Sequence, residues 1–275
     1  MKKSLSISVK DISTEHSKFL SRIQREKRFI RLWQWSLLFL IFALWEWAAR
    51  VNLIDSFITS QPSRIWATLV NLYLNGDLWR HIGLTLGETL AGFLSGTLLG
   101  ALIAMALWWL PFAAKVLDPY LVILNALPKI AMGPILIVWI GNGPFAIVAM
   151  ALLVSIIVTV ISVYTGFIQT DTDKIYLLRA FGATKWKVFT KVVLPSNMAN
   201  LVSALKINVG LSWVGVIVGE FLVSSGGLGY LIVYGGQVFQ LDLVMASVII
   251  LCFLAALMYQ SVLWVEKAMY RWRSG

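Results

Sequence analysis

Five ionisable side chains interrupt apolar stretches of this sequence, and their types and positions could support chemistry inside a membrane. They are Glu46, Glu88, Lys129, Lys206 and Glu220. A charge exposed to hydrocarbon is costly, so each must face a partner, a water-filled cavity or an interface. Ion and proton pathways are built from such groups, and we take Lys129, Glu220, Glu88 and Lys206 as candidate pathway or gate residues.

Two of the acidic groups also have a structural interpretation. Glu46 lies one helical turn before Arg50, which predicts an i, i+4 ion pair at the outer end of the first apolar run. Glu220 precedes residues 224–229, a glycine-rich stretch that allows a broken or re-entrant backbone. Glu220 therefore either lies at an outer gate or accepts hydrogen bonds from the backbone amides of that turn.

The two lysines have structural alternatives as well. Lys129 follows Pro128, where a kink frees backbone carbonyls, and we favour binding to these carbonyls over attraction of an anion in a pathway. Lys206 either pairs with Glu88 or extends to the cytoplasmic interface, and we favour the second arrangement.

Several other kinds of chemistry are excluded. The sequence has no Gly-x-x-x-x-Gly-Lys-Ser/Thr, so it lacks the phosphate-binding loop of an ATPase. Its two histidines, His16 and His81, and its one cysteine, Cys252, match neither a zinc site nor a catalytic triad. The net charge of +10 gathers at the ends of apolar runs, which argues against nucleic-acid binding. We therefore expect no catalytic residue and no metal site.

The elements that must position these groups are membrane helices. The 275 residues are 59% hydrophobic and only 13% charged, with a mean hydropathy of +0.80, so a lipid bilayer is the natural solvent. A span needs about 20 apolar residues. The apolar runs predict six spans, at 33–51, 82–109, 113–140, 144–168, 196–220 and 241–266. Tryptophans near the span ends predict an aromatic belt at the interfaces, and they include Trp33, Trp35, Trp108, Trp109 and Trp139.

Lysine and arginine set the orientation. They gather in the first 32 residues, in the 169–195 loop and near the C-terminus, which places both termini in the cytoplasm. The predicted organisation is a basic tail (1–32), a first span (33–51), an external loop with an interfacial helix (52–81), a five-span core (82–268) and a second tail (269–275).

Small residues recur at helical spacing along the second span. They are Gly87, Ala91, Gly92, Gly96 and Gly100. Such a stripe lets neighbouring helices approach closely, so we interpret it as a packing face.

The cytoplasmic loop between the fourth and fifth spans has its own pattern. Residues 174–181 contain no helix breaker, and Gly182 suits the left-handed conformation that ends a helix. A second helix is expected from Thr184, with Trp186 and Phe189 on one apolar face. Two aromatic residues in a water-facing loop predict a docking surface, although one of them could instead pack back on the membrane interface.

This loop resembles the coupling loop of binding-protein-dependent ABC transporter permeases, whose motif is Glu-Ala-Ala, three residues, Gly and later Leu-Pro. Gly182 matches the glycine, residues 183–186 match the usual continuation, and residues 192–195 match the closing segment. Tyr, Leu and Leu stand at the Glu-Ala-Ala positions. The resemblance implies an ATPase-coupling loop formed by Tyr176, Leu177, Leu178, Arg179, Ala180, Phe181, Gly182, Ala183, Thr184, Lys185, Trp186, Phe189, Leu194 and Pro195.

Short strings elsewhere resemble one branch of that family, which imports sulfonates, taurine, nitrate and pyrimidine-type thiamine precursors. They are Leu-Asp-Pro at 117–119, Ala-Leu-Pro at 126–128, Trp-Ile-Gly at 139–141, Val-Gly-Glu-Phe-Leu at 218–222 and Gly-Gly-Leu-Gly-Tyr at 226–230. Their order and spacing carry the resemblance over most of the chain after residue 60.

The resemblance implies an all-α membrane protein with the six-transmembrane-helix type I ABC importer permease fold and a cytoplasmic coupling helix. It further implies a multi-pass location in the bacterial inner membrane and a homodimer of permeases. The expected partners are two cytoplasmic ATPase subunits, which bind ATP and Mg, and an extracytoplasmic solute-binding protein. No cofactor is expected in this chain.

Two other classes remain as alternatives. A secondary, ion-coupled transporter would use the membrane charges for proton coupling, but it predicts an internal repeat that the sequence does not display. A membrane enzyme would need a nucleophile or metal ligands that the sequence lacks.

Overall fold

The computed structural model describes the backbone from Val9 to Ser274 and the side chains of residues 19–23 and 25–269. Residues 1–8 of the predicted basic tail, and the side chains of the last six residues of the chain, lie outside the described residues. The chain divides into two compact units, Met1–Arg64 and Ile65–Gly275. All the regular structure in the described part is helical.

The first unit is dominated by one long helix. α1 (Val9–Arg50) has 42 residues and is followed by α2 (Ser56–Thr59) and the start of α3 (Pro62–Leu74). At 1.5 Å per residue α1 is about 60 Å long, roughly twice the thickness of a bilayer core. The helix therefore includes much of the predicted basic tail as well as the first span.

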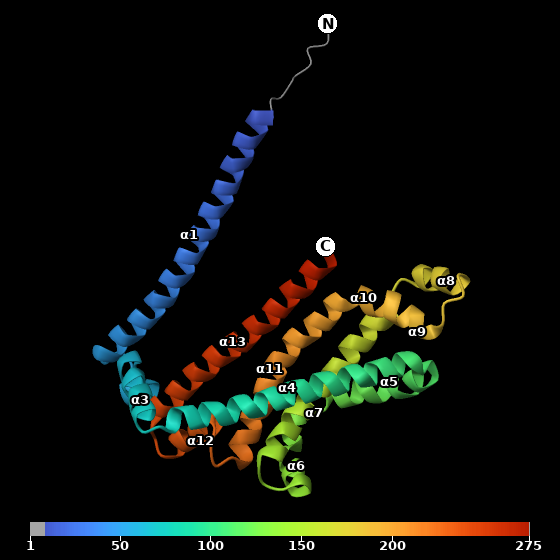
Figure 1. Cartoon of the computed structure of the whole chain (residues 1–275). Helices are drawn as coiled ribbons and strands as arrows, with labels where there is room; N and C mark the ends of the chain where they lie inside the picture. The colour runs from blue at the N-terminus through green and yellow to red at the C-terminus, as the bar shows by residue number, and fades with distance from the viewer. Residues whose placement is uncertain (1–8, 275) are drawn as a thin grey trace. The chain divides into compact units, whose positions relative to one another are not determined.

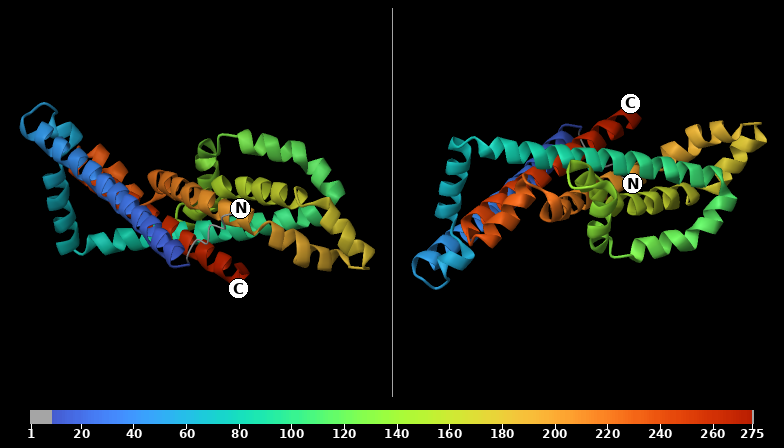
Figure 2. Two further views of the ribbon diagram at one scale, coloured as in Figure 1. Left: turned by 90° about the horizontal axis from the view of Figure 1, so that it is seen from above. Right: turned by 90° about the horizontal axis from the view of Figure 1, so that it is seen from below.

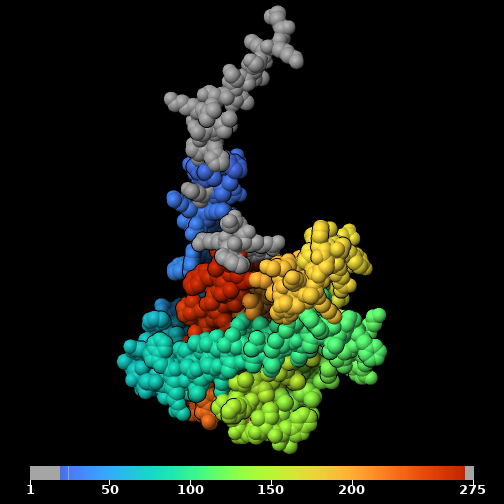
Figure 3. All heavy atoms as spheres, turned by 45° about the vertical axis from the view of Figure 1, so that its right-hand side comes forward, coloured from blue at the N-terminus to red at the C-terminus, as the bar shows by residue number. Residues whose placement is uncertain are grey.

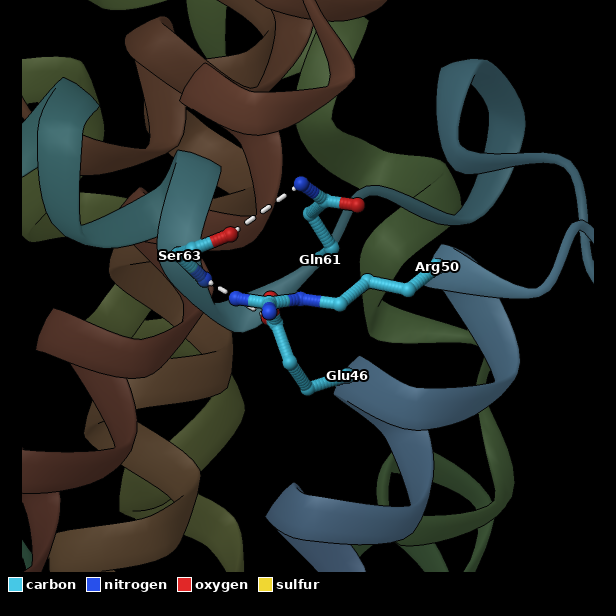
Figure 4. Close-up of polar contacts among 4 residues, drawn as sticks. All are labelled: Glu46, Arg50, Gln61 and Ser63. Atoms are coloured by element: carbon cyan, nitrogen blue, oxygen red, sulfur yellow. Dashed lines mark hydrogen bonds and ion pairs between the residues drawn. The ribbon is translucent and has the colours of Figure 1, made fainter.

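Glu46 and Arg50 form the predicted ion pair within this unit. Arg50 Nε lies 2.7 Å from Glu46 Oε1, and the second carboxylate oxygen accepts a hydrogen bond from the Ser63 amide at 3.0 Å (Figure 4). Gln61 Nε2 donates to Ser63 Oγ at 3.0 Å. Because the first amides of a helix have no partner within it, Glu46 also ties the start of α3 to α1.

The second unit holds the remaining helices (Figure 1). Its long helices are α4 (Asp77–Trp109), α7 (Pro144–Ile168), α11 (Met198–Val223) and α13 (Leu241–Ser274). Shorter ones in the chain between them are α5 (Pro111–Ala126), the 3-10 helix η1 (Lys129–Met132), α6 (Gly133–Ile140) and α12 (Leu228–Gln237). The loop after α7 contains α8 (Thr172–Ala180), α9 (Lys185–Val188), the π-helix η2 (Phe189–Val193) and α10 (Leu194–Ser196).

Among the described residues, five helices are long and apolar enough to cross a membrane. α5 and the η1–α6 segment pass the same test together but are bent by 87°, so the described residues give six spans if this pair counts as one broken span. The bend falls at Leu127 and Pro128, where proline removes an amide donor. α12 is only 10 residues long, too short to cross by itself.

α4, α7 and α11 form the tightly packed centre of the second unit. α4 and α7 run side by side in both views of Figure 2. Three positions of the predicted small-residue stripe make this contact: Gly92 faces Ala151, Gly96 faces Ser155 and Gly100 faces Thr159. On α11, Gly215 also lies against Ala151.

Fewer residues of the predicted small-residue stripe pack against a neighbouring helix than expected. Gly87 and Ala91 are exposed, and nothing lies within 4 Å of a Cβ added at Gly87. At 3.6 residues per turn, Gly87 lies more than a third of a turn away from the face that carries Gly92. Only the i, i+4 series from Gly92 therefore packs within this chain.

Two glycines of α11 offer a matched test of this packing. Gly215→Val would push side-chain atoms against the Ala151 backbone, whereas the space around Gly210 is open. Overpacking a well-packed core costs about 1–3 kcal/mol. We expect Gly215→Val to lower the thermal unfolding midpoint of the detergent-solubilised protein, followed by tryptophan fluorescence, and Gly210→Val to change it little. Equal midpoints would contradict the close packing.

Candidate functional site

The loop between α7 and α11 begins with a capped helix. Asp171 Oδ1 accepts the Asp173 amide at 3.0 Å, and the other oxygen lies 3.3 Å from Lys174 Nζ. The Asp173 amide, together with Lys174, holds the pKa of the Asp171 carboxyl below its ordinary value. The acidic group thus satisfies the free amides at the start of α8.

Gly182 makes the turn that the sequence predicts. Its φ is +77°, in the left-handed region, and its amide donates to the Arg179 carbonyl at 2.9 Å. Ala183 N donates to the Leu178 carbonyl at 3.1 Å, which closes the end of α8. Thr184 then accepts the Lys187 amide through its hydroxyl and begins α9, as predicted. The end of α8 and the start of α9 are therefore both held by hydrogen bonds.

The loop carries large apolar side chains on its exposed surface, and it forms a lobe of the second unit (Figure 3). They are Tyr176 (65% exposed), Leu177 (57%), Phe181 (82%) and Trp186 (58%). We call these four residues the exposed loop patch. Leu178 and Ala183 are half-buried beneath them, whereas Arg179, Ala180 and Thr184 are exposed.

Phe189 does not belong to the exposed loop patch, and it is the one of the two aromatic residues, Trp186 and Phe189, that packs back. It is only 3% exposed, and its ring lies 5.1 Å from Trp108 and 5.5 Å from Phe167. It packs back on the protein because η2 turns it towards the ends of α4 and α7. Leu194 is half-buried and Pro195 is exposed, and both belong to α10, just before α11.

A second group of functional side chains lies at the turn between α11 and α12. Glu220 is 1% exposed; its Oε1 accepts the Thr85 hydroxyl at 2.6 Å and its Oε2 accepts the Gly229 amide. The Thr85 oxygen accepts the Leu228 amide at 2.7 Å. Glu220 thus takes the predicted role of acceptor for this turn.

His81 completes the network from one helical turn earlier on α4. Its Nδ1 accepts the Gly227 amide at 2.9 Å, and its ring stacks on Tyr230 with centroids 6.2 Å apart. Gly227 has a φ of +103°, and a Cβ there would overlap the Glu220 carboxylate. Because 146 residues separate His81 from Gly227, no local sequence pattern connects His81 with this turn.

Glu88 lies on α4 close to Glu220, and both side chains are buried. Its Oε2 has no hydrogen-bond partner among the described residues. Glu88 therefore lies beside this network, which leaves one of its oxygens unsatisfied.

Lys206 pairs with Glu266. Its Nζ lies 2.7 Å from Glu266 Oε2, so the pairing with Glu88 is wrong. The ion pair joins α11 to α13 and is partly exposed. Extension of the lysine to the cytoplasmic interface stays a prediction, and Glu266 is the last residue of the sixth predicted span.

Lys129 takes the favoured structural arrangement. Its Nζ donates to the Asn125 carbonyl at 2.8 Å, at the end of α5 where the bend leaves carbonyls without helical partners. Lys129, Lys206 and Glu220 are thus all engaged in structural contacts.

Among the described residues, no group of three or more His, Cys, Asp and Glu side chains could hold a metal ion.

Comparisons with known proteins identify relatives of this chain. Residues 96–273 match the family described as the binding-protein-dependent transport system inner membrane component. A probable ABC transporter permease of Haemophilus influenzae is 30% identical, covering 82% of this chain and 91% of the relative. The putative aliphatic sulfonates transport permease SsuC of Bacillus subtilis is 27% identical, covering 85% of each. The formylaminopyrimidine transport permease ThiX of Halalkalibacterium halodurans is 27% identical, covering 85% of this chain and 93% of the relative.

A solved structure shows the same fold. The MetNI methionine ABC transporter, in an inward-facing conformation, superposes with a TM-score of 0.57 at 21% identity, covering 76% of this chain and 98% of that one. The predicted all-α permease fold is therefore confirmed.

The Thr85 hydroxyl can be tested for its part in the network. Thr85→Val keeps the shape but leaves the Leu228 amide and a Glu220 oxygen without a partner, at about 1–3 kcal/mol for each buried group. Thr85→Ser retains the hydroxyl. We expect a clear fall in the thermal unfolding midpoint for Thr85→Val and a much smaller one for Thr85→Ser. An unchanged midpoint for Thr85→Val would show that the hydroxyl does not hold the turn.

Proposed function

Since this chain belongs to the family of binding-protein-dependent transport system inner membrane components, we propose that its exposed loop patch docks on a cytoplasmic ATPase subunit. The chain is the membrane-spanning permease subunit of an ATP-binding-cassette importer and is not itself an enzyme. The single observation that carries the docking proposal is the exposure of four large apolar side chains on the loop between α7 and α11.

Such a patch is unusual on a surface that faces water. Contiguous apolar groups on a soluble surface typically mark a site of protein–protein contact. Tyr176, Leu177 and Phe181 lie on α8 or at its end, and Trp186 lies on α9, so the patch spans both sides of the Gly182 turn. Docking across that turn would move the two short helices as one body.

The loop is also built to transmit a displacement. Beneath the patch, Val188 and Val193 are fully buried and Phe189 packs on α4 and α7. A rigid, packed element that has two positions is what couples distant sites in a protein. The nucleotide and its Mg belong to the partner, since this sequence has no phosphate-binding loop.

The full assembly proposed here contains two permease copies, two ATPase subunits and an external solute-binding protein. Family membership supports the ATPase and the binding protein. The second permease copy is part of the proposal because the family resemblance implies it. The excess of basic residues at the chain ends and in the loop supports cytoplasmic termini.

Of the relatives named above, SsuC is described as a putative aliphatic sulfonates transport permease and ThiX as a formylaminopyrimidine transport permease. We take these two kinds of small solute as the first substrates to test. A secondary transporter finds no support, since Lys129, Lys206 and Glu220 are engaged in structural contacts.

The docking proposal predicts a specific loss of the ATPase. Phe181 and Phe145 are both 82% exposed, but Phe145 begins α7, at the end opposite to the loop. Burial of a phenylalanine contributes about 1.5–3 kcal/mol, or about 10- to 100-fold in affinity. We expect Phe181→Ser to lose the ATPase during affinity purification from native membranes, while Phe145→Ser retains it. Retention by both variants would place docking elsewhere.

The Gly182 turn predicts a second, conformational effect. Asn tolerates the left-handed conformation, whereas a β-branched residue pays about 1–2 kcal/mol for it. We expect Gly182→Val to reduce ATP-driven uptake of an aliphatic sulfonate or formylaminopyrimidine about tenfold, and Gly182→Asn to retain most of it, at equal membrane levels. If the Val variant transports like the unmodified chain, the turn is not needed for coupling.

A further inference from the structure

Lys185 is the charged residue that fastens the loop to a helix outside it. It is the first residue of α9 and is half-buried. Its Nζ donates to the carbonyl of Trp109, the last residue of α4, at 2.6 Å and across 76 residues of sequence. The last carbonyls of a helix have no partner within it and carry the negative end of its dipole, so a cation is well placed there.

Two tryptophan rings surround the same ammonium group. Nζ lies 5.4 Å from the centroid of Trp108 and 5.3 Å from that of Trp109, within the range of cation–π attraction. The rings in turn contact the loop: Trp109 lies 6.0 Å from Trp186, and Trp108 lies 5.1 Å from Phe189. The ammonium therefore lies at the centre of an aromatic cluster shared by α4 and the loop.

α4 differs from the other helices beneath the loop in how it is connected. α7 and α11 flank the loop in the chain, so they must follow it through the backbone. α4 joins it only through side chains. The aromatic contacts spread over whole ring surfaces, whereas the hydrogen bond from Lys185 joins one atom of the loop to one atom of α4.

The other end of α4 holds the turn between α11 and α12. His81 and Thr85 accept the amides of Gly227 and Leu228, as described above. α4 is a continuous helix of 33 residues, about 50 Å long at 1.5 Å per residue. A displacement at Trp109 can therefore reach the far end of the helix without an intervening hinge.

We propose that Lys185 is a positioning residue that couples movement of the loop to α4, and through α4 to the Gly227–Gly229 turn on the other side of the membrane. This inference rests on the proposed docking of an ATPase on the loop. It adds to that proposal the side chain through which the movement leaves the loop.

The test uses the full permease–ATPase complex in proteoliposomes with a reporter at the far end of α4. Trp79 is 64% exposed and lies near the start of α4, so Trp79→Cys offers a labelling position once Cys252 is replaced by Ser. An environment-sensitive fluorophore there would report movement on addition of ATP and vanadate. No transported solute is needed for this readout.

Lys185→Met keeps the length of the side chain and removes its charge and donors, and Lys185→Arg restores them. Lys187→Met is the matched control, since Lys187 is exposed on the same short helix. We expect Lys185→Met to retain the ATPase. Its fluorescence response should be smaller than that of the unmodified complex by a factor of about ten or more, since a charged hydrogen bond contributes roughly 1.5–3 kcal/mol. Lys185→Arg should recover most of the response, and Lys187→Met should match the unmodified complex.

The outcomes separate this inference from the docking proposal. If no ATPase accompanies the unmodified chain, the docking proposal itself fails. If the ATPase is retained and the response of Lys185→Met is undiminished, the docking proposal stands and the role of Lys185 is overturned. Loss of the ATPase from Lys185→Met also overturns it, because the residue would then act in docking. Lys185→Gln serves for the same comparison if the methionine variant does not accumulate.

Discussion

A membrane offers no water to a broken helix, and this constraint explains where the polar side chains of the chain lie. Two of the breaks between the apolar segments of the second unit are the bend after α5 and the turn after α11. At the first, Lys129 binds the freed carbonyl of Asn125. At the second, Glu220, Thr85 and His81 accept the amides of Gly227, Leu228 and Gly229. Groups that resemble an ion pathway in the sequence are thus needed to keep the fold intact.

This use of polar groups depends on close approach of the helices that carry them. Lipid tails are as apolar as leucine side chains, so helices in a bilayer associate through packing and hydrogen bonds. Gly92, Gly96 and Gly100 allow α4 to approach α7, and Gly215 allows α11 to approach the same helix. With the backbones this close, Thr85 on α4 reaches Glu220 on α11 across 135 residues of sequence.

Local features of this kind were predictable, and contacts between distant segments were not. The i, i+4 spacing of Glu46 and Arg50, the left-handed turn at Gly182 and the carbonyl contact of Lys129 each depend on neighbours within a few residues. The partner of Lys206 lies 60 residues away, and the aromatic contacts of Phe189 come from two other helices. Periodicity shows which face of a helix is apolar but not which helix covers it. It also could not distinguish Trp108 and Trp109 as loop contacts from members of an aromatic belt.

The chain passes through two solvents, and the loop after α7 lies where they meet. In the bilayer, association depends on shape and hydrogen bonds, whereas in water the burial of apolar surface becomes the main driving force. The exposed loop patch, which includes Phe181 and Trp186, has the apolar exposure that burial in a partner would remove from water. Phe189 and Val188, close to the patch in the sequence, are buried against the helix ends. Because one short loop presents an apolar surface on each side, it would keep its contacts with the membrane helices while it bound the proposed soluble partner.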